Sequence, residues 1–250
     1  MGVLINCFKV VSISRKWSFE YQWEKYHTRE LTYGMSSEQE FEKFCHDLQI
    51  RPHHLKGKRI LDAGCGSGRL TRVVAEYAKE AYGVDLIKLP RDSKVKFVRA
   101  DIQKLPFKKG YFDYVYCEGV LHHTPHPKQA FMELARVNKG RLFVMLYSHR
   151  NIFMKIRCYF FTYRYPHGVL RVISLFLALL FFIPMNIYKI IFNRDKSYTL
   201  SSLDFFIFDY ISPLYQSVHG VEEVKGWFKE AGYRHIVQVS KRDTEVLGVK

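Results

Sequence analysis

The sequence predicts an α/β protein with a parallel sheet at its centre and helices on both faces. From residue 58 onward, short β-forming runs alternate with helix-like stretches, the order that right-handed β–α–β crossovers require. A glycine-rich turn at residues 62–68 joins the first strand to the first helix. With 250 residues, 48% of them hydrophobic, the chain can form one such domain with an insertion.

The first strand ends in Asp62, and glycines follow at positions 64, 66 and 68. Glycine lets the backbone turn sharply and lets a ligand approach closely. Residues 69–79 then predict a helix, whose N-terminus offers free N–H groups that suit a carboxylate or phosphate. This segment therefore predicts a site for a small anionic or zwitterionic cofactor.

Three further strands end near acidic residues. Residues 82–85 end in Asp85, where a carboxylate can accept hydrogen bonds from ribose hydroxyls. Residues 97–102 contain Asp101, and a fourth strand over residues 112–117 leads into Glu118. Ligands of open α/β sheets bind beyond the carboxyl ends of the strands, so these acids are candidate site residues.

The later elements follow the same alternation. Residues 127–137 predict an amphipathic helix with proline near its start, and residues 141–146 predict a strand buried on both faces. A helix over residues 221–232, closed by glycine, precedes strands at residues 235–240 and 244–249.

The pattern D-x-G-x-G-x-G at residues 62–68 resembles motif I of the class I S-adenosylmethionine-dependent methyltransferases. The acids at 85 and 101 and the L-H-H sequence after the fourth strand resemble later motifs of that family, in order and spacing. The resemblance implies a Rossmann-like, seven-stranded, mostly parallel sheet with an antiparallel C-terminal hairpin and a helical insertion. The third glycine comes one residue earlier than in the dinucleotide pattern G-x-G-x-x-G, which disfavours NAD.

The resemblance also implies S-adenosylmethionine as cofactor and direct methyl transfer from its sulfonium. Asp62 and the glycine turn would hold the methionine end, Asp85 the ribose and Asp101 the adenine. The segment after the fourth strand would pass under the sulfonium. The expected cofactor-binding residues are Asp62, Gly64, Cys65, Gly66, Gly68, Asp85, Leu86, Asp101, Ile102, Glu118, Gly119 and Val120.

An oxygen or nitrogen acceptor often needs a base, and His122 and His123 follow the fourth strand. A neutral imidazole there could take a proton near neutral pH, so both are candidate catalytic residues. The alternative is that the pair only orients this loop. His126 is close in sequence, but the three histidines lack carboxylate or cysteine companions at ligand spacing, so no metal is expected.

The resemblance and the apolar pattern together divide the chain into four segments. They are a basic lead with a helical lid at 1–57, a cofactor-binding core at 58–147, an apolar and basic helical insertion at 148–216, and a C-terminal helix with an edge hairpin at 217–250. Trp23 and Tyr26 would face the sulfonium from the lid, because aromatic faces attract cations. A helix that merely packs on the domain is the alternative.

The insertion contains an apolar run at residues 172–183, which Pro184 and Lys189 follow. One membrane crossing is excluded if the fold is right, because strands before and after the run join one sheet. Two interpretations remain: a helix buried in a cap or homodimer interface, or a helix or hairpin in an anionic membrane surface. Residues 150–196 carry eight basic side chains, which suit the second; they are Arg150, Lys155, Arg157, Arg164, Arg171, Lys189, Arg194 and Lys196.

The formal net charge of +15 favours an anionic partner, either nucleic acid or a membrane surface. Five scattered cysteines favour a cytoplasmic protein, peripheral on the inner membrane face if the insertion binds lipid. The sequence therefore predicts a methyltransferase with a small or lipid-linked acceptor. A tRNA methyltransferase and a cofactor-binding scaffold without turnover are the alternatives.

Overall fold

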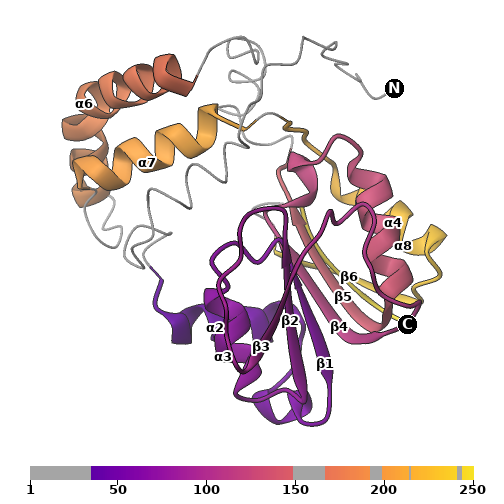
Figure 1. The fold of residues 1–250 in the computed structure, drawn as a ribbon. Helices are drawn as coiled ribbons and strands as arrows, with labels where there is room; N and C mark the ends of the chain where they lie inside the picture. Colours follow the sequence, from indigo (N-terminus) through magenta and orange to yellow (C-terminus); the bar gives the residue numbers. More distant parts are fainter. Residues whose placement is uncertain (1–34, 149–166, 192–198, 214, 241–243) are drawn as a thin grey trace. The chain divides into compact units, whose positions relative to one another are not determined.

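The computed structural model describes residues 35–148, 167–191, 199–213, 215–240 and 244–250 (Figure 1). The chain forms two compact units. The smaller consists of Met1–Tyr26 and Lys155–Leu214, and the larger consists of His27–Met154 and Tyr215–Lys250. The larger unit contains the sheet and the predicted site, and the smaller contains a pair of helices.

The larger unit is built on one seven-stranded sheet with the order β3-β2-β1-β4-β5-β7-β6. The first five strands are parallel, and the last two are antiparallel to their neighbours, so the predicted fold class is confirmed. The strands are β1 (Arg59–Ala63), β2 (Glu80–Asp85), β3 (Val95–Arg99), β4 (Phe112–Glu118), β5 (Asn138–Leu146), β6 (His235–Ser240) and β7 (Thr244–Val249).

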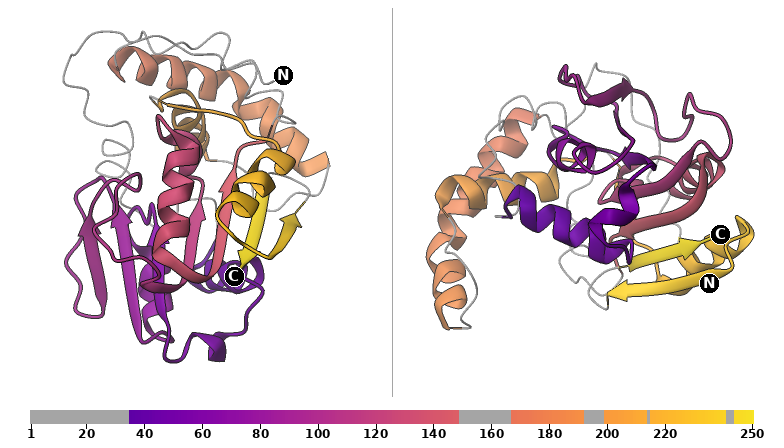
Figure 2. Two further views of the ribbon diagram at one scale, coloured as in Figure 1. Left: turned by 90° about the vertical axis from the view of Figure 1, so that its right-hand side faces the viewer. Right: turned by 90° about the horizontal axis from the view of Figure 1, so that it is seen from below.

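Helices cover both faces of this sheet (Figure 2). One core contains apolar side chains of α4 (Pro127–Val137) and α8 (Val221–Glu230), and the other contains those of α2 (Ser37–Asp47) and α3 (Arg69–Ala75). Short 3-10 turns, η1 (Pro52–Leu55) and η2 (Leu121–His123), precede β1 and follow β4. Because β1, β2, β3 and β4 pair in parallel, their carboxyl ends lie at the same edge of the sheet, and η2 follows β4 there.

Several predicted boundaries differ from the structure by two to four residues, and three of them adjoin the site. The helix expected over residues 69–79 ends at Ala75, because the amides of Lys79 and Glu80 already donate to Lys58 O at the start of β2. The third strand ends at Arg99 instead of Asp101, because the chain turns at Asp101. The fifth strand begins at Asn138, three residues early, and continues the end of α4.

The smaller unit contains α6 (His167–Ile191) and α7 (Leu200–Ile211). Helix α6 continues through Pro184, which follows the apolar run at residues 172–183. Where the two helices pack, Asp204 accepts a hydrogen bond from Ser174 Oγ at 2.7 Å and pairs with Arg171 at 2.7 Å. Both Ser174 and Asp204 are buried, so this polar contact fixes the α6–α7 register inside apolar surroundings.

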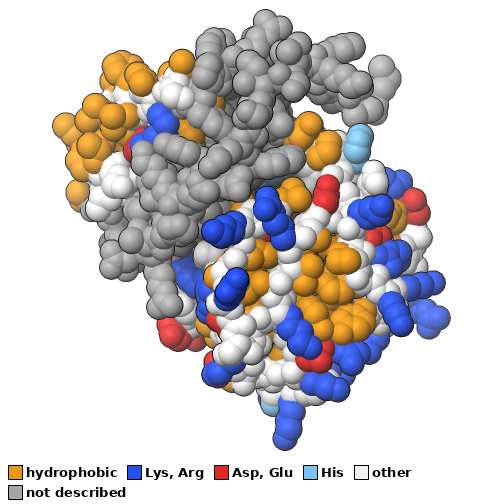
Figure 3. All heavy atoms as spheres, in the orientation of Figure 1, with side chains coloured by type: hydrophobic (Ala, Val, Ile, Leu, Met, Phe, Trp, Pro, Cys, Tyr) orange, Lys and Arg blue, Asp and Glu red, His pale blue; other side chains and the backbone are white. Residues whose placement is uncertain are grey.

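The outer side of α6 is apolar and exposed. Of the fifteen large apolar side chains that are exposed in the described part of the chain, twelve lie on α6. Figure 3 shows hydrophobic side chains gathered where this helix lies. By length and composition, Gly168–Ile191 could cross a membrane, and it is the one such helix among the described residues. Since β5 and β7 are hydrogen-bonded neighbours, the chain between them must leave and return on the same side of any bilayer.

Candidate cofactor site at the carboxyl ends of the strands

The turn between β1 and α3 is held by backbone hydrogen bonds and by glycine geometry. The amides of Gly64 and Cys65 donate to Val84 O at 2.7 and 3.1 Å, which ties the turn to the end of β2. Gly64 has a φ of +81°, and a Cβ there would lie 2.2 Å from a methyl group of Val120. Glycine is therefore required at this position, both for its backbone angle and for the close approach of the segment after β4.

The carboxylate of Asp85, at the end of β2, accepts hydrogen bonds from three backbone amides. Its Oδ2 accepts from the Gly66 amide at 2.9 Å, and its Oδ1 accepts from the amides of Leu86 and Ile87 at 2.7 and 3.3 Å. A carboxylate has about four acceptor positions, so these bonds leave room for about one ligand hydroxyl. Burial raises the pKa of Asp85, and the three amide hydrogen bonds oppose that shift.

Asp62 lies at the end of β1, and its side chain is buried. Thr71 of α3 donates its hydroxyl to Asp62 Oδ2 at 2.5 Å. Burial, followed by the charges of Asp85 and Glu118, raises the pKa of Asp62 to about 7, and the Thr71 hydrogen bond offsets part of that rise. The structure therefore brings the carboxyl groups from the ends of β1, β2 and β4 together, as the sequence predicted.

Glu118, the last residue of β4, is held by α2. Lys43 Nζ lies 2.7 Å from Glu118 Oε1, and Tyr116 donates its hydroxyl to Glu118 Oε2 at 2.7 Å. The same ammonium lies 2.6 Å from the buried carboxylate of Asp47. The site thus has a cationic neighbour on α2 that the sequence did not predict, because 75 residues separate Lys43 from Glu118.

The other predicted cofactor residues lie around these acids. The Ala100 amide donates to Asp85 O at 3.0 Å, which places the segment after β3 beside the end of β2. Asp101 is held locally, with its Oδ1 accepting from the Gln103 amide at 2.8 Å. The side chain of Ile102 is buried in the core, so its backbone is the part available to a ligand. A Cβ at Gly119 would meet nothing within 4 Å.

The two candidate catalytic histidines differ in their surroundings. His122 is fully buried and stacks on Tyr147 with ring centroids 3.9 Å apart, and its Nδ1 accepts from the Tyr147 amide at 3.3 Å. His123 is half-buried, and its Nδ1 lies 3.0 Å from Tyr215 O. Because a carbonyl only accepts, the Nδ1 of His123 carries the proton. Of the two rings, only that of His123 has surface from which it could reach an acceptor.

A second polar group beside this loop was not predicted. The Ser217 amide donates to His122 O at 2.9 Å, and the His219 amide donates to Tyr147 O at 2.9 Å. Ser217, His219 and Glu223 are hydrogen-bonded to one another. Their order, S-x-H-x-x-x-E, is visible in the sequence, but nothing local indicates that it meets the end of β4 about 95 residues earlier in the chain.

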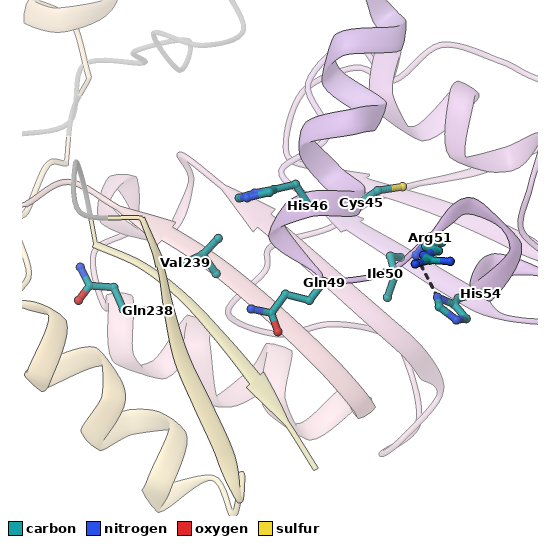
Figure 4. Close-up of a pocket in the computed structure, with 8 residues that line it drawn as sticks. All are labelled: Cys45, His46, Gln49, Ile50, Arg51, His54, Gln238 and Val239. Atoms are coloured by element: carbon teal, nitrogen blue, oxygen red, sulfur yellow. Dashed lines mark hydrogen bonds between the residues drawn. The ribbon is translucent and has the colours of Figure 1, made fainter.

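A separate cavity of about 430 Å³ lies between the end of α2, η1 and β6 (Figure 4). Its lining includes His46, Gln49 and Arg51 on one side and Gln238 and Val239 on the other. None of its eight lining residues belongs to the predicted cofactor set. The cavity therefore does not mark the cofactor site, which is defined here by the converging acids and the glycine turn.

Comparison with known proteins shows the family of the chain. The family described as "Methyltransferase domain" matches residues 61–144, which run from β1 through β5. An uncharacterised methyltransferase from Synechocystis sp. is 30% identical over 155 residues, and the match covers 56% of this chain and 70% of that protein. The chain belongs to the class I S-adenosylmethionine-dependent methyltransferases.

More distant matches extend the comparison. A cycloartenol-C-24-methyltransferase from Arabidopsis thaliana is 29% identical over 135 residues, or 48% of this chain and 40% of that protein. The chain thus covers less than half the length of that relative. A magnesium protoporphyrin IX methyltransferase from Synechocystis PCC 6803 has the same fold, with a TM-score of 0.52, 15% identity, and coverage of 92% and 93% of the two chains.

Proposed function

We propose that this protein transfers a methyl group from S-adenosylmethionine to a lipid or lipid-linked acceptor at an anionic membrane surface. The observation that carries the proposal is the exposed apolar side of α6 in a chain that also has the cofactor cradle. A sterol methyltransferase among the relatives supports a lipid-like acceptor. Peripheral association is consistent with β5 and β7 lying side by side in one sheet.

The residues of the cradle fit this cofactor. The carboxyl groups of Asp62, Asp85 and Glu118 meet where a ligand with two cationic groups and ribose hydroxyls would lie. When bound, the cofactor supplies an electrophilic methyl group. We assign Asp62 to the methionine end, Asp85 to the ribose, and Asp101 with the Ile102 backbone to the adenine.

Around the acceptor, we infer different roles for the two histidines. His122 is buried against Tyr147, where it would orient the loop after β4. His123 is the member of the pair that could contact an acceptor, and its Nδ1–H donates to Tyr215 O, which leaves Nε2 as the basic nitrogen. The proposed lid residues Trp23 and Tyr26 lie outside the described residues.

The membrane surface is proposed from α6. Val172, Phe176 and Ile183 are 63–70% exposed, and the side of the helix that faces α7 carries the buried residues Ser174 and Ala178. Burying apolar area stabilises lipid binding by about 25 cal/mol per Å². Of the basic residues around the helix, Arg171 pairs with Asp204, Lys189 lies in its last turn, and the other six lie outside the described residues.

A Phe176→Glu/Leu179→Glu variant should lose binding to vesicles of phosphatidylcholine with 30% phosphatidylglycerol, where the wild type floats with the lipid. Charged groups on the apolar side would have to be dehydrated to enter the membrane. Flotation measures the bound fraction, with about a tenfold loss expected. Gln49→Glu/Gln129→Glu adds the same charge on the larger unit and should float like the wild type.

Three other results would contradict the membrane proposal. The two variants could float equally, or the wild type could fail to bind vesicles and instead bind tRNA in a salt-sensitive way. The wild type could also form a homodimer that is lost in the Phe176→Glu/Leu179→Glu variant. The enzymatic proposal is tested separately, by transfer of labelled methyl groups from S-adenosylmethionine into a total lipid extract.

Cofactor affinity should depend on pH through Asp62. Without a ligand, the pKa of the Asp62 carboxyl group is about 7, above its ordinary value of 3.8. The ionised carboxylate therefore lowers the stability of the fold at neutral pH, and this loss of stability is relieved as pH falls from 7 to 3.8. A cationic ligand favours the ionised form, so binding should be about tenfold weaker at pH 6 than at pH 8. Calorimetry with S-adenosylmethionine measures this. The Asp62→Asn variant should bind equally at both pH values, and a pH-independent wild type would contradict the assignment.

A further inference from the structure

Ser217, His219 and Glu223 form a chain of hydrogen bonds that the proposed cofactor set does not use. Ser217 Oγ lies 2.8 Å from His219 Nε2, and His219 Nδ1 lies 3.0 Å from Glu223 Oε1. An ionised carboxylate only accepts, so Nδ1 carries the proton and Nε2 accepts from the Ser217 hydroxyl. This order of hydroxyl, base and orienting acid is the arrangement that activates a hydroxyl group in enzymes.

The fold holds this chain at the carboxyl ends of β4 and β5. The Ser217 and His219 amides are bound to His122 O and Tyr147 O, in the segments that follow these two strands. Thr244 donates its hydroxyl to His219 O at 2.7 Å, and the imidazole packs against Trp227 with centroids 5.1 Å apart. These contacts restrict the backbone and ring of His219 before any ligand arrives.

Burial and charge also suit a relay. The side chain of His219 is 11% exposed, whereas that of Glu223 is 47% exposed. Ser217 as a whole is half-buried, and the imidazole behind it is largely shielded from water. Ser217 Oγ is also 3.4 Å from His122 O, a longer contact than the one to His219. Glu223 lies in the first turn of α8, where a carboxylate is favoured by the helix dipole.

We propose that Ser217, His219 and Glu223 form a proton relay for an acceptor whose methylated atom is a hydroxyl oxygen or an amine nitrogen. This inference rests on the proposed function. As the acceptor atom bonds to the methyl carbon and the carbon–sulfur bond breaks, the acceptor proton moves to Ser217 Oγ. The Ser217 proton moves to His219 Nε2, and Glu223 stabilises the resulting imidazolium.

Reaction with a fluorophosphonate tests the relay without an acceptor. Labelling forms a Ser217 Oγ–phosphorus bond, expels fluoride and passes the serine proton to His219, so it requires an activated hydroxyl. Peptide mass spectrometry should find the label on Ser217. The labelling rate should fall about 100-fold in His219→Asn, the lower end of the range for loss of general-base catalysis. It should fall less, about tenfold, in Glu223→Gln, because the base itself remains. Ser36→Ala, a control distant in sequence, should label normally. Absence of label on Ser217 would overturn the relay.

Methyl transfer into total lipid extract, measured from pH 6 to 9, tests the role in the reaction. Ser217→Ala should lower kcat at every pH, and Glu223→Gln should move the lower limb of the pH profile, with melting temperatures unchanged. Wild-type rates in Ser217→Ala would overturn the relay while leaving the enzyme proposal intact. If the wild type transfers nothing to lipid, the proposed function fails, and labelling alone then decides whether Ser217 is activated.

Discussion

A Gly64→Ala variant should lose about 2–5 kcal/mol of unfolding free energy. The left-handed backbone costs alanine about 1–2 kcal/mol, and forcing Val120 away from a Cβ at 2.2 Å adds about 1–3 kcal/mol. Moving Val120 also displaces the segment after β4, so binding of S-adenosylhomocysteine should fall at least tenfold. Urea unfolding and calorimetry measure the two effects.

Gly57→Ala is the matched control for this variant. Gly57 has a φ of +79°, and a Cβ there would meet nothing within 4 Å. Gly57→Ala should therefore lose only the about 1–2 kcal/mol of unfolding free energy that a left-handed backbone costs alanine, and its ligand affinity should not change. If both variants lose the same stability and both bind ligand normally, the close packing of Gly64 against Val120 has no role in the site.

The second large effect is expected for Asp85→Ala. The substitution removes the acceptor of three backbone amides at the end of β2, and each buried unpaired group costs about 1–3 kcal/mol. Loss of the ribose contact should weaken S-adenosylhomocysteine binding by about 1–3 kcal/mol, or about 5- to 150-fold. Calorimetry on the folded variant separates the binding effect from the loss of stability.

Asp92→Ala provides the comparison for Asp85. Asp92 also accepts from two backbone amides, at 2.9 and 3.2 Å, and pairs with Arg72 at 3.0 Å. It belongs to no part of the proposed cradle, so its removal should lower stability and leave ligand affinity unchanged. Equal affinity losses in the two variants would mean that Asp85 acts only through folding.

The sequence predicted those features of the fold that are local. Each parallel strand is a short run of β-forming residues, and the three glycines of the turn after β1 all have a positive φ. Asp62, Asp85 and Glu118 could therefore be placed at one edge before the structure was known. The boundary errors arose where neighbouring elements compete. Helix α3 ends early because the amides of Lys79 and Glu80 donate to Lys58 O, just before β1. The hydrophobic periodicity of residues 69–79 does not indicate this contact.

Contacts between distant residues were the part that sequence could not supply. Lys43 reaches Glu118 because α2 packs on the face of the sheet that carries α3, and Ser217 reaches His122 because the chain returns after the insertion. The three amides that donate to the Asp85 carboxylate were likewise not predicted from the sequence. Helix α6 extends beyond the apolar run at residues 172–183, through Pro184 to Ile191.

A crystal structure with S-adenosylhomocysteine would test the cradle most directly. We expect the adenosine to lie across the ends of β1, β2 and β3, with a ribose hydroxyl on Asp85 and the homocysteine beside Asp62. A ligand seated in the cavity between α2 and β6, or one that leaves these carboxylates untouched, would contradict the account.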